Sequence, residues 1–360
     1  MPVPPPPCSY TTHTLNCFPT IDKLCYTLGP FRSSVHDKDS QLNVFASNKH
    51  FQIELKAANF EKSPTLLADY LRYLEHLEPD YLPESDEEFD SEDPLEELAE
   101  WVLECFLPIF REIPPSDIHQ KYTLHDCLFP EVFHYSLDVH QDKLSPIFLD
   151  KAGEKRFLGA LIPEQVDYST FPIYRPDQIE ISILDDSNTL PAVPRKVYIQ
   201  GQHIQVAFLK SVGAGDVNSI CRELNAYTKI QSALFSKPIN TSRLLGIVRI
   251  PSSGRIVGLL LSYIESKDNK TLLCMGQDPQ YVSMGQKWLS QITQSIEGLH
   301  VCGAVWGDAK PDNVLIDTHF DAYLIDFGGG YTRGWVDKEL ANTAEGDLQG
   351  LQRITEFLFE

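Results

Sequence analysis

One stretch of the sequence, residues 305–328, constrains the fold more than any other. It reads VWGDAKPDNVLIDTHFDAYLIDFG. Two short apolar runs, 314–316 and 323–325, flank a polar turn, and this pattern predicts a pair of antiparallel strands. Pairing of these strands would place the residues just before the first strand beside the residues just after the second.

The residues at the two ends of this expected hairpin are polar or charged. Asp308 and Asn313 precede the first strand, and Asp326 follows the second. Carboxylate and amide oxygens suit Mg²⁺, which takes oxygen ligands and usually keeps phosphate in its shell. Lys310 stands two residues after Asp308 and would bring a positive charge to a phosphoryl group. The hairpin therefore predicts a site for magnesium and phosphate.

This segment resembles the catalytic loop and the metal-binding loop of eukaryotic-type protein kinases. The matching residues, at the separation usual in that family, are Asp308, Lys310, Pro311, Asn313, Asp326, Phe327 and Gly328. More loosely, the surrounding sequence is similar to the kinase-like proteins of filamentous fungi. The resemblance implies a two-lobed α+β domain that moves the γ-phosphate of ATP, with Mg²⁺ as cofactor, to a serine- or threonine-like hydroxyl.

The resemblance also implies a role for each residue of the stretch. Asp308 would accept or orient the proton of the attacking hydroxyl, and Lys310 would contact the γ-phosphate. Asn313 and Asp326 would hold the magnesium ion. Because protein groups take little part in the covalent chemistry of this reaction, positioning and charge neutralisation would dominate catalysis.

Residues from an earlier part of the chain would complete the implied nucleotide site. The run VAFLK at 206–210 is similar to the family's Val-Ala-Ile-Lys strand, so Lys210 would hold the α- and β-phosphates. A predicted helix carries Glu223, which would be the ion-pair partner of Lys210. Farther on, the backbone from Ser262 to Ile264 would form the hinge that bonds the adenine ring.

Apolar residues at helical spacing, Trp288, Ile292, Ile296 and Leu299, predict a helix that leads into the catalytic loop. Asp347, beyond the metal-binding loop, looks like the family's buried aspartate, which clamps the backbone of the catalytic loop.

Several departures from the family pattern change what the resemblance implies. Trp306 and Gly307 stand where the family has His-Arg, and without that arginine a phosphorylated loop has no partner there. We therefore expect activity that does not require loop phosphorylation. Residues 185–194 contain no glycine, so the usual glycine-rich phosphate lid is missing. No Ala-Pro-Glu stretch is present, and the sequence ends where the family's peptide-binding helices would begin, which leaves the acceptor undetermined.

Two other interpretations of function remain open. Small-molecule kinases similar to the aminoglycoside phosphotransferases also carry Gly-Asp in this loop, although they usually have histidine in place of Lys310. The second alternative is an inactive, nucleotide-binding pseudokinase that serves as an interaction module. The presence of all the reacting residue types favours an active enzyme whose acceptor is the hydroxyl of a protein or of a small molecule.

The first half of the sequence holds most of the acidic excess behind the net charge of −21. Such a surface disfavours nucleic acid and anionic membranes as partners, and no run approaches the roughly 18 apolar residues of a membrane span. Residues 84–100 are rich in acids, which indicates a solvated linker or, alternatively, a docking segment for a basic protein. Eight cysteines without a CxxC pair indicate reduced thiols in a cytoplasmic or nuclear protein.

These patterns predict three parts of the chain. Residues 1–40 would form a flexible tail, and residues 41–173 an acidic region of mixed α and β structure with unknown function. Residues 174–360 would form the kinase-like domain, with an N-lobe over 174–266 and a short C-lobe over 267–360.

Within the acidic region, alternating residues predict a hairpin over 41–56 that turns at Asn48. Helices are expected after Ser63 and after Asp93, and strands over 120–150. Strand alternation over that last range does not bring its potential metal ligands together, so we expect no metal cluster of His125, Cys127, His134 and His140.

Overall fold

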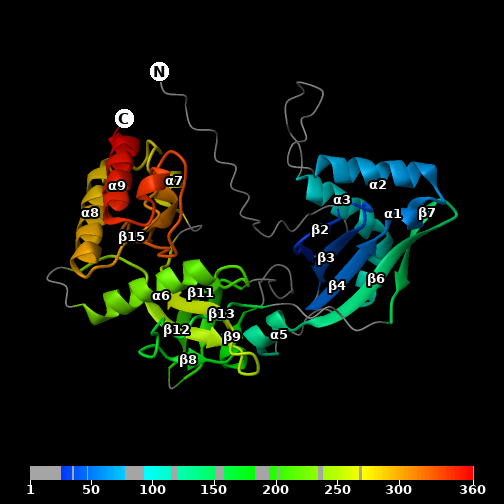
Figure 1. Cartoon of the computed structure of the whole chain (residues 1–360), viewed down its shortest axis with the longest axis horizontal. Coiled ribbons are helices and arrows are strands. Elements are labelled where there is room, and N and C mark those ends of the chain that lie inside the picture. Colours follow the sequence, from blue (N-terminus) through cyan, green and yellow to red (C-terminus); the bar gives the residue numbers. More distant parts are fainter. Residues whose placement is uncertain are drawn as a thin grey trace. The chain divides into compact units, whose positions relative to one another are not determined.

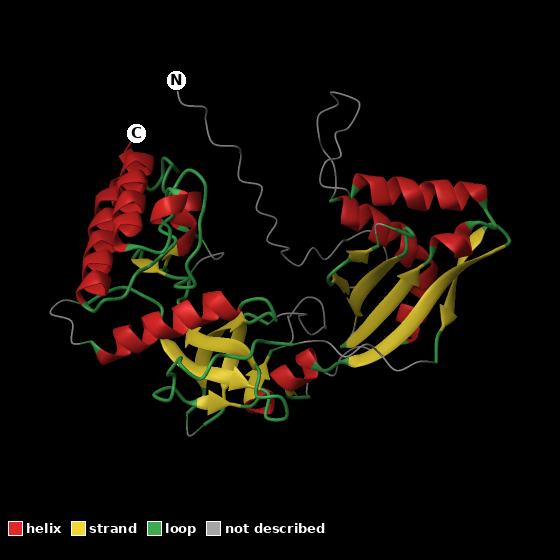
Figure 2. Cartoon of the chain, in the orientation of Figure 1, coloured by secondary structure: helices red, strands yellow, loops and turns green. Residues whose placement is uncertain are grey.

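The computed structural model describes residues 26–34, 36–46, 48–77, 93–114, 120–150, 158–182, 194–201, 203–233, 238–266 and 270–359. These residues form helices together with sheets of six, seven and two strands, which agrees with the predicted α+β class (Figures 1 and 2). The described residues fall into two compact units, each with an apolar core of its own. The first unit comprises 26–122, 126–150 and Ser182, and the second comprises 123–125, 158–181 and 194–359.

The six-stranded sheet of the first unit contains the hairpin that alternation predicts. Strands β3 (Ser40–Ala46) and β4 (Lys49–Leu55) pair antiparallel on either side of Asn48, whose φ of 61° is tolerated better by asparagine than by most residues. Strand β6 (Glu131–His140) pairs parallel with β4, and β7 (Lys143–Phe148) pairs antiparallel with β6.

The strands at the other edge of this sheet show that the prediction of a flexible tail over residues 1–40 was wrong for its last part. Strands β1 (Tyr26–Leu28) and β2 (Arg32–Ser33) both pair with β3, so the chain is already structured at residue 26, well before residue 40. These strands are too short for residue alternation to show them, and a Gly-Pro pair separates them. The part of the predicted tail before residue 26 lies outside the described residues.

Helices bury the apolar face of this sheet. They are α1 (Ala57–Phe60), α2 (Pro64–His76), α3 (Pro94–Leu103) and α4 (Leu107–Glu112). Phe60, Tyr70 and Leu98 are fully buried in the same core as the apolar residues of β3 and β4. A 3₁₀ turn, Glu104–Phe106, separates α3 from α4, and Pro108 lies in the first turn of α4, where a proline is tolerated.

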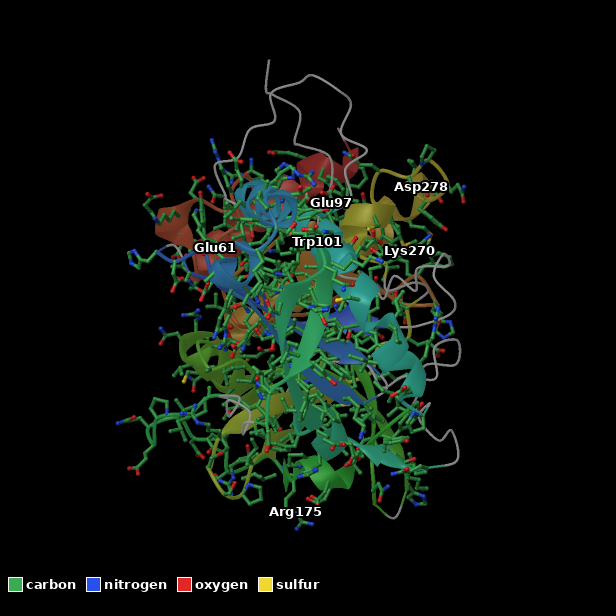
Figure 3. All side chains as sticks on the ribbon, turned by 90° about the vertical axis from the view of Figure 1, so that its right-hand side faces the viewer. Glu61, Glu97, Trp101, Arg175, Lys270 and Asp278 are labelled. Atoms are coloured by element: carbon green, nitrogen blue, oxygen red, sulfur yellow. The ribbon has the colours of Figure 1, made fainter. Side chains whose placement is uncertain are left out.

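Helix α3 begins with the cap that the sequence predicts. Asp93 Oδ1 accepts a hydrogen bond from Leu95 N at 2.9 Å, which satisfies one of the free N–H groups at the helix start. On the same helix, Trp101 (labelled in Figure 3) is half-buried, and its ring lies near those of Phe60 and Tyr73. The preceding residues 78–92, which include most of the acidic segment 84–100, lie outside the described residues.

A short helix interrupts the strands expected over 120–150. Helix α5 spans Leu124–Leu128, so His125 and Cys127 lie on a helix and not on a strand as expected. A helix of barely one turn is too short for hydrophobic periodicity to distinguish it from a strand.

The second unit is built on a seven-stranded sheet with the order β5-β9-β10-β11-β13-β12-β8. Its strands are β5 (Tyr122–Thr123), β8 (Ile173–Tyr174), β9 (Ile179–Ile181), β10 (Lys196–Ile199), β11 (Gln205–Ser211), β12 (Leu244–Arg249) and β13 (Ile256–Ser262). The pairs β10–β11 and β12–β13 are antiparallel neighbours along the chain, whereas β8 pairs parallel with β12.

The predicted domain boundary near Tyr174 lies inside this second unit. Residues 158–173 pack with the sheet, since Ala160 forms a β-bridge with Ile256 and Phe171 is buried in the same core. This stretch lacks hydrophobic periodicity, so the sequence alone did not indicate that it packs here.

Helices and a small hairpin complete the second unit. They are α6 (Val217–Ser232), α7 (Leu272–Met275), α8 (Gly285–Val301), β14 (Val314–Ile316), β15 (Ala322–Leu324) and α9 (Ala344–Phe359). Figure 1 shows α6 beside the seven-stranded sheet and α8 beside α9. The predicted apolar face of α8 is confirmed, because Trp288 and Ile292 are fully buried, and Leu224 on α6 is fully buried as well. Burial of a side chain of this size stabilises a fold by about 1.5–3 kcal/mol.

Two further observations concern the described residues only. None of their helices combines the length and the apolar character that crossing a membrane requires. Their cysteines, which are Cys105, Cys127, Cys221, Cys274 and Cys302, are all free thiols.

Candidate functional site

The β14–β15 hairpin positions the polar residues at its two ends. Val314 pairs with Leu324, and one residue farther out Ile325 N donates a hydrogen bond to Asn313 O at 3.0 Å. Asp326 follows Ile325 directly, so the expected pairing of strands places Asn313 and Asp326 at one end of the hairpin. Asp326 has a φ of 63°, which is unusual for a residue other than glycine.

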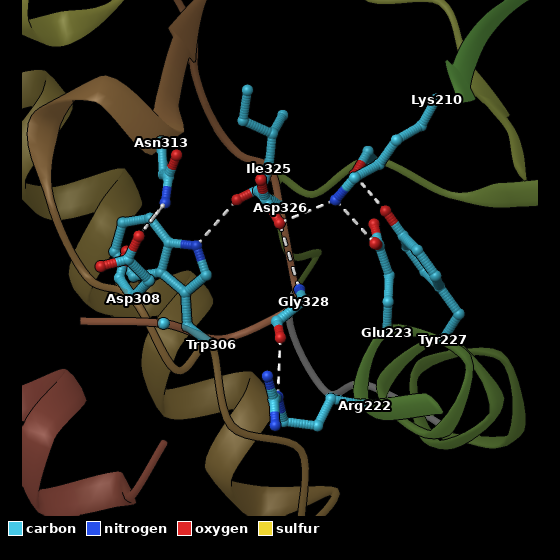
Figure 4. Close-up of polar contacts among 12 residues, drawn as sticks. Lys210, Arg222, Glu223, Tyr227, Trp306, Asp308, Asn313, Ile325, Asp326 and Gly328 are labelled. Carbon is cyan, nitrogen blue, oxygen red and sulfur yellow. Dashed lines mark hydrogen bonds and ion pairs between the residues drawn. The ribbon is translucent and has the colours of Figure 1, made fainter. Parts of the chain in front are cut away.

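Lys210 connects the seven-stranded sheet to this hairpin (Figure 4). Its Nζ lies 2.7 Å from Glu223 Oε2 on α6 and 2.8 Å from Asp326 Oδ1. The Glu223 side chain is fully buried, whereas that of Asp326 is 45% exposed. The expected Lys210–Glu223 ion pair is therefore present. The direct contact of Lys210 with Asp326 is an addition that the sequence did not predict.

Burial and charge act against each other in this group of three side chains. Burial raises the pKa of Glu223, and the Lys210 ammonium only partly offsets this effect. Burial alone would lower the pKa of Lys210, but the carboxylates of Glu223 and Asp326 raise it above its ordinary value. Burial would likewise raise the pKa of Asp326, but Lys210 lowers it below its ordinary value. Lys210 and Asp326 are thus held in their charged forms.

Asp308 lies at the centre of a second polar group. Its Oδ2 lies 2.8 Å from Lys310 Nζ, and its Oδ1 accepts a hydrogen bond from Thr332 Oγ1 at 3.1 Å. Lys310 Nζ also donates to Thr332 Oγ1 at 2.8 Å. Asn313 Nδ2 donates to the backbone oxygen of Asp308 at 2.9 Å and to its Oδ2 at 3.2 Å. Three side chains, those of Lys310, Asn313 and Thr332, thus fix the carboxylate of Asp308.

The side-chain oxygen atoms of Asn313 and Asp326 that these hydrogen bonds do not use suit a hard divalent cation. Because Asn313 gives its amide nitrogen to Asp308, the amide oxygen Oδ1 is the atom that remains for a ligand. Asp326 Oδ1 accepts from Lys210 and from Gly328 N, which leaves Oδ2. The described residues hold no cluster of three or more His, Cys, Asp or Glu side chains arranged for a metal. Asn313 and Asp326 therefore fit Mg²⁺ only as a pair of oxygen ligands completed by phosphate and water.

Asp347, at the start of α9, anchors the chain that precedes Asp308. This carboxylate is almost fully buried and accepts hydrogen bonds from Trp306 N and Gly307 N, both at 2.8 Å. His300 Nε2 lies 2.9 Å from it. The expected hydrogen bonds between Asp347 and the backbone just before Asp308 are therefore present.

Trp306 links this backbone to the segment that leads into Asp326. Its indole Nε1 donates to Ile325 O at 2.9 Å (Figure 4). Its ring is fully buried. An aromatic ring with one N–H group thus both fills the core and holds the residue before Asp326.

The backbone explains why residue 307 is glycine and not arginine. Gly307 has a φ of 91°, a conformation that residues with a Cβ rarely adopt. A Cβ at this position would lie 3.1 Å from Gly329 Cα and 3.4 Å from Asn342 Oδ1. The loop after Asp326 thus lies too close to position 307 to leave ready space for a larger side chain.

Two residues expected to bind adenine lie apart from these contacts. Ser262 N donates to Arg243 O at 2.8 Å, and Ser262 Oγ accepts from Arg243 N at 2.9 Å, so this residue holds the start of β12. Ile264 follows the end of β13 and is half-buried. Their place beside adenine stays a prediction. The glycine-free segment 185–194, apart from Pro194, lies outside the described residues.

Other residues at the site had not been expected from the sequence. Arg222 Nε donates to Gly328 O at 2.7 Å, and Asn342 Oδ1 accepts from Gly330 N at 3.2 Å. Thr332 contacts both Asp308 and Lys310. Each contact joins residues distant in sequence, so no local pattern could have shown it.

Comparison with known proteins gives partial matches to kinases. No protein-family model matches the sequence. The chain is 36% identical over 86 residues to serine/threonine-protein kinase MRCK gamma of Homo sapiens, and 34% identical over 86 residues to that of Mus musculus. It is 36% identical over 70 residues to serine/threonine-protein kinase LATS1 of Homo sapiens.

These matches cover 23%, 23% and 19% of this chain and only 6% of each relative. Part of the chain is therefore similar to serine/threonine protein kinases. The resemblance to fungal proteins stays a prediction.

Proposed function

We propose that this protein is an ATP-dependent phosphotransferase of the protein kinase type, which moves the γ-phosphate to a serine- or threonine-like hydroxyl. The partial similarity to serine/threonine kinases supports the kinase class. The observation that carries the proposal is the position of Lys210, whose ammonium contacts Glu223 on one side and Asp326 on the other. Strand β11, helix α6 and the loop after β15 thus bring together a lysine, a glutamate and an aspartate, which are the residue types that the kinase family uses to bind the phosphates and the metal.

In this proposal the second unit is a two-lobed kinase-like domain. The seven-stranded sheet and α6 form the N-lobe, and α7, α8, α9 and the small hairpin form the C-lobe. ATP lies between them, with its adenine on the backbone of Ser262 to Ile264. The contact between Lys210 and Asp326 supports this arrangement, because it joins the sheet to the loop after β15.

Asp308 is the proposed base. Asn313 and Lys310 hold its carboxylate in place, so the acceptor hydroxyl meets an oriented oxygen to which it can pass its proton. Lys310 Nζ, only 2.8 Å from this carboxylate, would also stabilise negative charge on the phosphoryl group during transfer.

Lys210, Asn313 and Asp326 are the proposed nucleotide and metal ligands. Lys210 would bind the α- and β-phosphates while Glu223 keeps its ammonium oriented. Asn313 Oδ1 and Asp326 Oδ2 would hold Mg²⁺, which when bound neutralises charge on the phosphates. Asp326 is suited to this role because its lowered pKa keeps it ionised at neutral pH.

Thermal unfolding with and without Mg-ATP tests nucleotide binding. A ligand present at 100 times its Kd stabilises the folded state by about 2.7 kcal/mol, so we expect the wild-type Tm to rise by several degrees. Asp326→Ala should lose this rise, and Asp308→Asn should keep it. A wild-type Tm that does not respond to Mg-ATP at millimolar concentration would contradict the proposal.

Transfer of radiolabelled γ-phosphate tests the chemistry. Proton transfer by a positioned side chain typically contributes about 10²–10⁴-fold, so Asp308→Asn should slow transfer by at least that order. Serine- and threonine-containing peptides and aminoglycosides serve as separate acceptors. Label in aminoglycosides alone would favour the small-molecule kinase, and a Tm response without transfer to any acceptor would favour the pseudokinase.

A further inference from the structure

Strand β11, which carries Lys210, departs from the family pattern at one position. In Val-Ala-Ile-Lys the alanine stands two residues before the lysine. The run VAFLK is one residue longer, so Phe208 stands two residues before Lys210 and Ala207 stands three before it. Side chains two residues apart on a strand point to the same face of the sheet. Phe208 therefore shares a face of β11 with Lys210, and Ala207 lies on the opposite face.

The packing of these residues agrees with this assignment of faces. The Lys210 ammonium contacts a carboxylate on α6, and Phe208 packs against the apolar core that contains Leu224 of the same helix. Phe208 is only half-buried, whereas Ala207 and Leu209 are buried. The phenylalanine ring thus keeps accessible surface on the side of the sheet to which Lys210 points.

Strand pairing places Phe208 beside the end of β13. Phe208 lies opposite Lys196 of β10 and opposite Leu261 of β13, so these three side chains share one face. Just after β13, the ring of Tyr263 lies 4.9 Å from Lys196 Nζ. Phe208 is therefore next to the backbone of 262–264, the segment proposed to bind the base of the nucleotide.

The spacing along β11 matches the layout of a nucleotide. Cα atoms two residues apart on a strand are separated by about 6.6–6.8 Å. If Lys210 holds the α- and β-phosphates and the base lies at the end of β13, the base comes to the position of Phe208. Ser262 N already donates to Arg243 O, so this N–H group does not read an edge of the base. A contact with the face of the base requires no such group.

We propose that Phe208 is a specificity-determining residue whose ring stacks on the base of the bound nucleotide. This inference rests on the proposed function, because Lys210 and the phosphates set the position of the base. The family's alanine has no aromatic ring and cannot make this contact. Since every base has a π face, stacking favours nucleotides over base-free polyphosphates without distinguishing among bases.

Isothermal titration calorimetry of the full-length chain with Mg-ATP, Mg-GTP and Mg-tripolyphosphate tests this contact. Alanine substitution of a ring that stacks on a base weakens binding by roughly 5- to 150-fold. Phe208→Ala should therefore weaken the binding of Mg-ATP and of Mg-GTP by the same factor within this range. The affinity for Mg-tripolyphosphate, which has no base, should not change.

Three further variants separate stacking from other effects of the substitution. Phe208→Tyr keeps the ring and should bind Mg-ATP as wild type does. Phe208→Leu keeps most of the bulk without a π face and should lose most of the affinity that Phe208→Ala loses. Leu209→Ala truncates the neighbouring side chain on the opposite face, so it should lower stability and leave the Kd for Mg-ATP unchanged.

Two results would overturn the inference while leaving the proposed function intact. One is a Phe208→Ala variant that binds Mg-ATP as tightly as wild type or more tightly, which would mean that the ring lies away from the base or obstructs it. The other is a Phe208→Leu variant with wild-type affinity, which would mean that bulk and not stacking matters. Wild-type protein that does not bind Mg-ATP at all would end both proposals together.

Discussion

The ammonium group of Lys210 forms ion pairs with two carboxylates whose surroundings are very different. Glu223 is fully buried, and Lys210 is its described ion-pair partner, whereas the more exposed Asp326 also accepts from the backbone of Gly328. Removal of Lys210 would therefore affect Glu223 far more than Asp326. The stability of the unit depends on Lys210 even before any nucleotide binds.

Lys210→Met should destabilise the protein strongly. Breaking a buried ion pair by removing one partner typically costs about 3–5 kcal/mol, because the remaining charge is buried without compensation. The double variant Lys210→Met, Glu223→Gln should recover much of this loss, since it removes the buried charge as well. Urea unfolding at pH 7 measures both free energies. A single variant as stable as the double variant would contradict the interpretation.

The same pair of variants should differ in the way stability depends on pH. Burial raises the pKa of Glu223 above its ordinary value of 4.5, and without Lys210 no cation opposes this shift. As pH rises from about 4.5, the unfolded glutamate loses its proton first, so Lys210→Met should lose stability until the raised folded pKa is passed. The double variant lacks this titration. Identical pH profiles of the two variants would contradict this prediction.

Gly307→Arg should damage the site, although it restores the residue usual in the kinase family. The φ of 91° strains any residue with a Cβ, at a cost of about 1–2 kcal/mol. Gly307→Ala is the control that measures this backbone cost alone. We expect the arginine variant to be less stable than the alanine variant and to transfer phosphate no faster than wild type. Greater transfer by Gly307→Arg would show that the loop adapts to the side chain.

At the scale of elements, helix α9 holds the segment 306–309 by two different contacts. Asp347 accepts two hydrogen bonds from the loop backbone, and Gly350, one turn later, lies directly against Ala309. The absence of a side chain at Gly350 lets the helix approach the residue that follows Asp308.

Gly350→Ala should therefore destabilise the protein, although alanine favours helices by about 1 kcal/mol over glycine. The added Cβ would lie 2.5 Å from Ala309 Cβ and 2.6 Å from Ala309 O, and such overpacking costs about 1–3 kcal/mol or more. Leu348→Ala on the same helix is the control, because Leu348 is 53% exposed. The measurement is urea unfolding, together with the Mg-ATP response of Tm. A Gly350→Ala variant more stable than wild type would refute the tight contact.

Long or paired elements of the chain could be predicted from the sequence. The apolar spacing of Trp288 and Ile292 indicates α8, and the two apolar runs around the polar turn indicate β14 and β15. Short elements without such a pattern could not be predicted. Strands β1 and β2 and helix α5 have no matching apolar run close by in the sequence, so neither a period nor a pairing pattern shows them.

At the candidate site, too, some contacts could be predicted from the sequence and others could not. Proximity of Asn313 to the residue before Asp326 follows from strand pairing, and the Lys210–Glu223 pair follows from the family resemblance. The contacts of Thr332 with Asp308 and Lys310 depend on the path of a loop that has no regular structure. Only the three-dimensional structure shows such contacts, because no sequence pattern fixes the path of this loop.

At the scale of the whole molecule, the chain carries two separate cores. Leu98 is buried in the core of the first unit, and Ile292 in the core of the second. Since each unit has its own core, we expect two unfolding transitions in calorimetry. Leu98→Ala should lower one transition and Ile292→Ala the other, because truncation of either side chain costs about 2–5 kcal/mol.

Mg-ATP should raise only the transition that Ile292→Ala lowers. This outcome assigns the nucleotide to the second unit without any need to separate the units. A single transition that both variants lower equally would show that the two units unfold together.

The bond between Lys210 and Asp326 joins positions 116 residues apart in the sequence. During synthesis, a nascent chain that has not yet reached Asp326 can pair Lys210 only with Glu223. The group of three charged side chains is thus completed only after a further 103 residues beyond Glu223 have been synthesised. A premature stop codon after position 223 and no later than position 326 would yield a product that contains Lys210 and Glu223 but lacks Asp326.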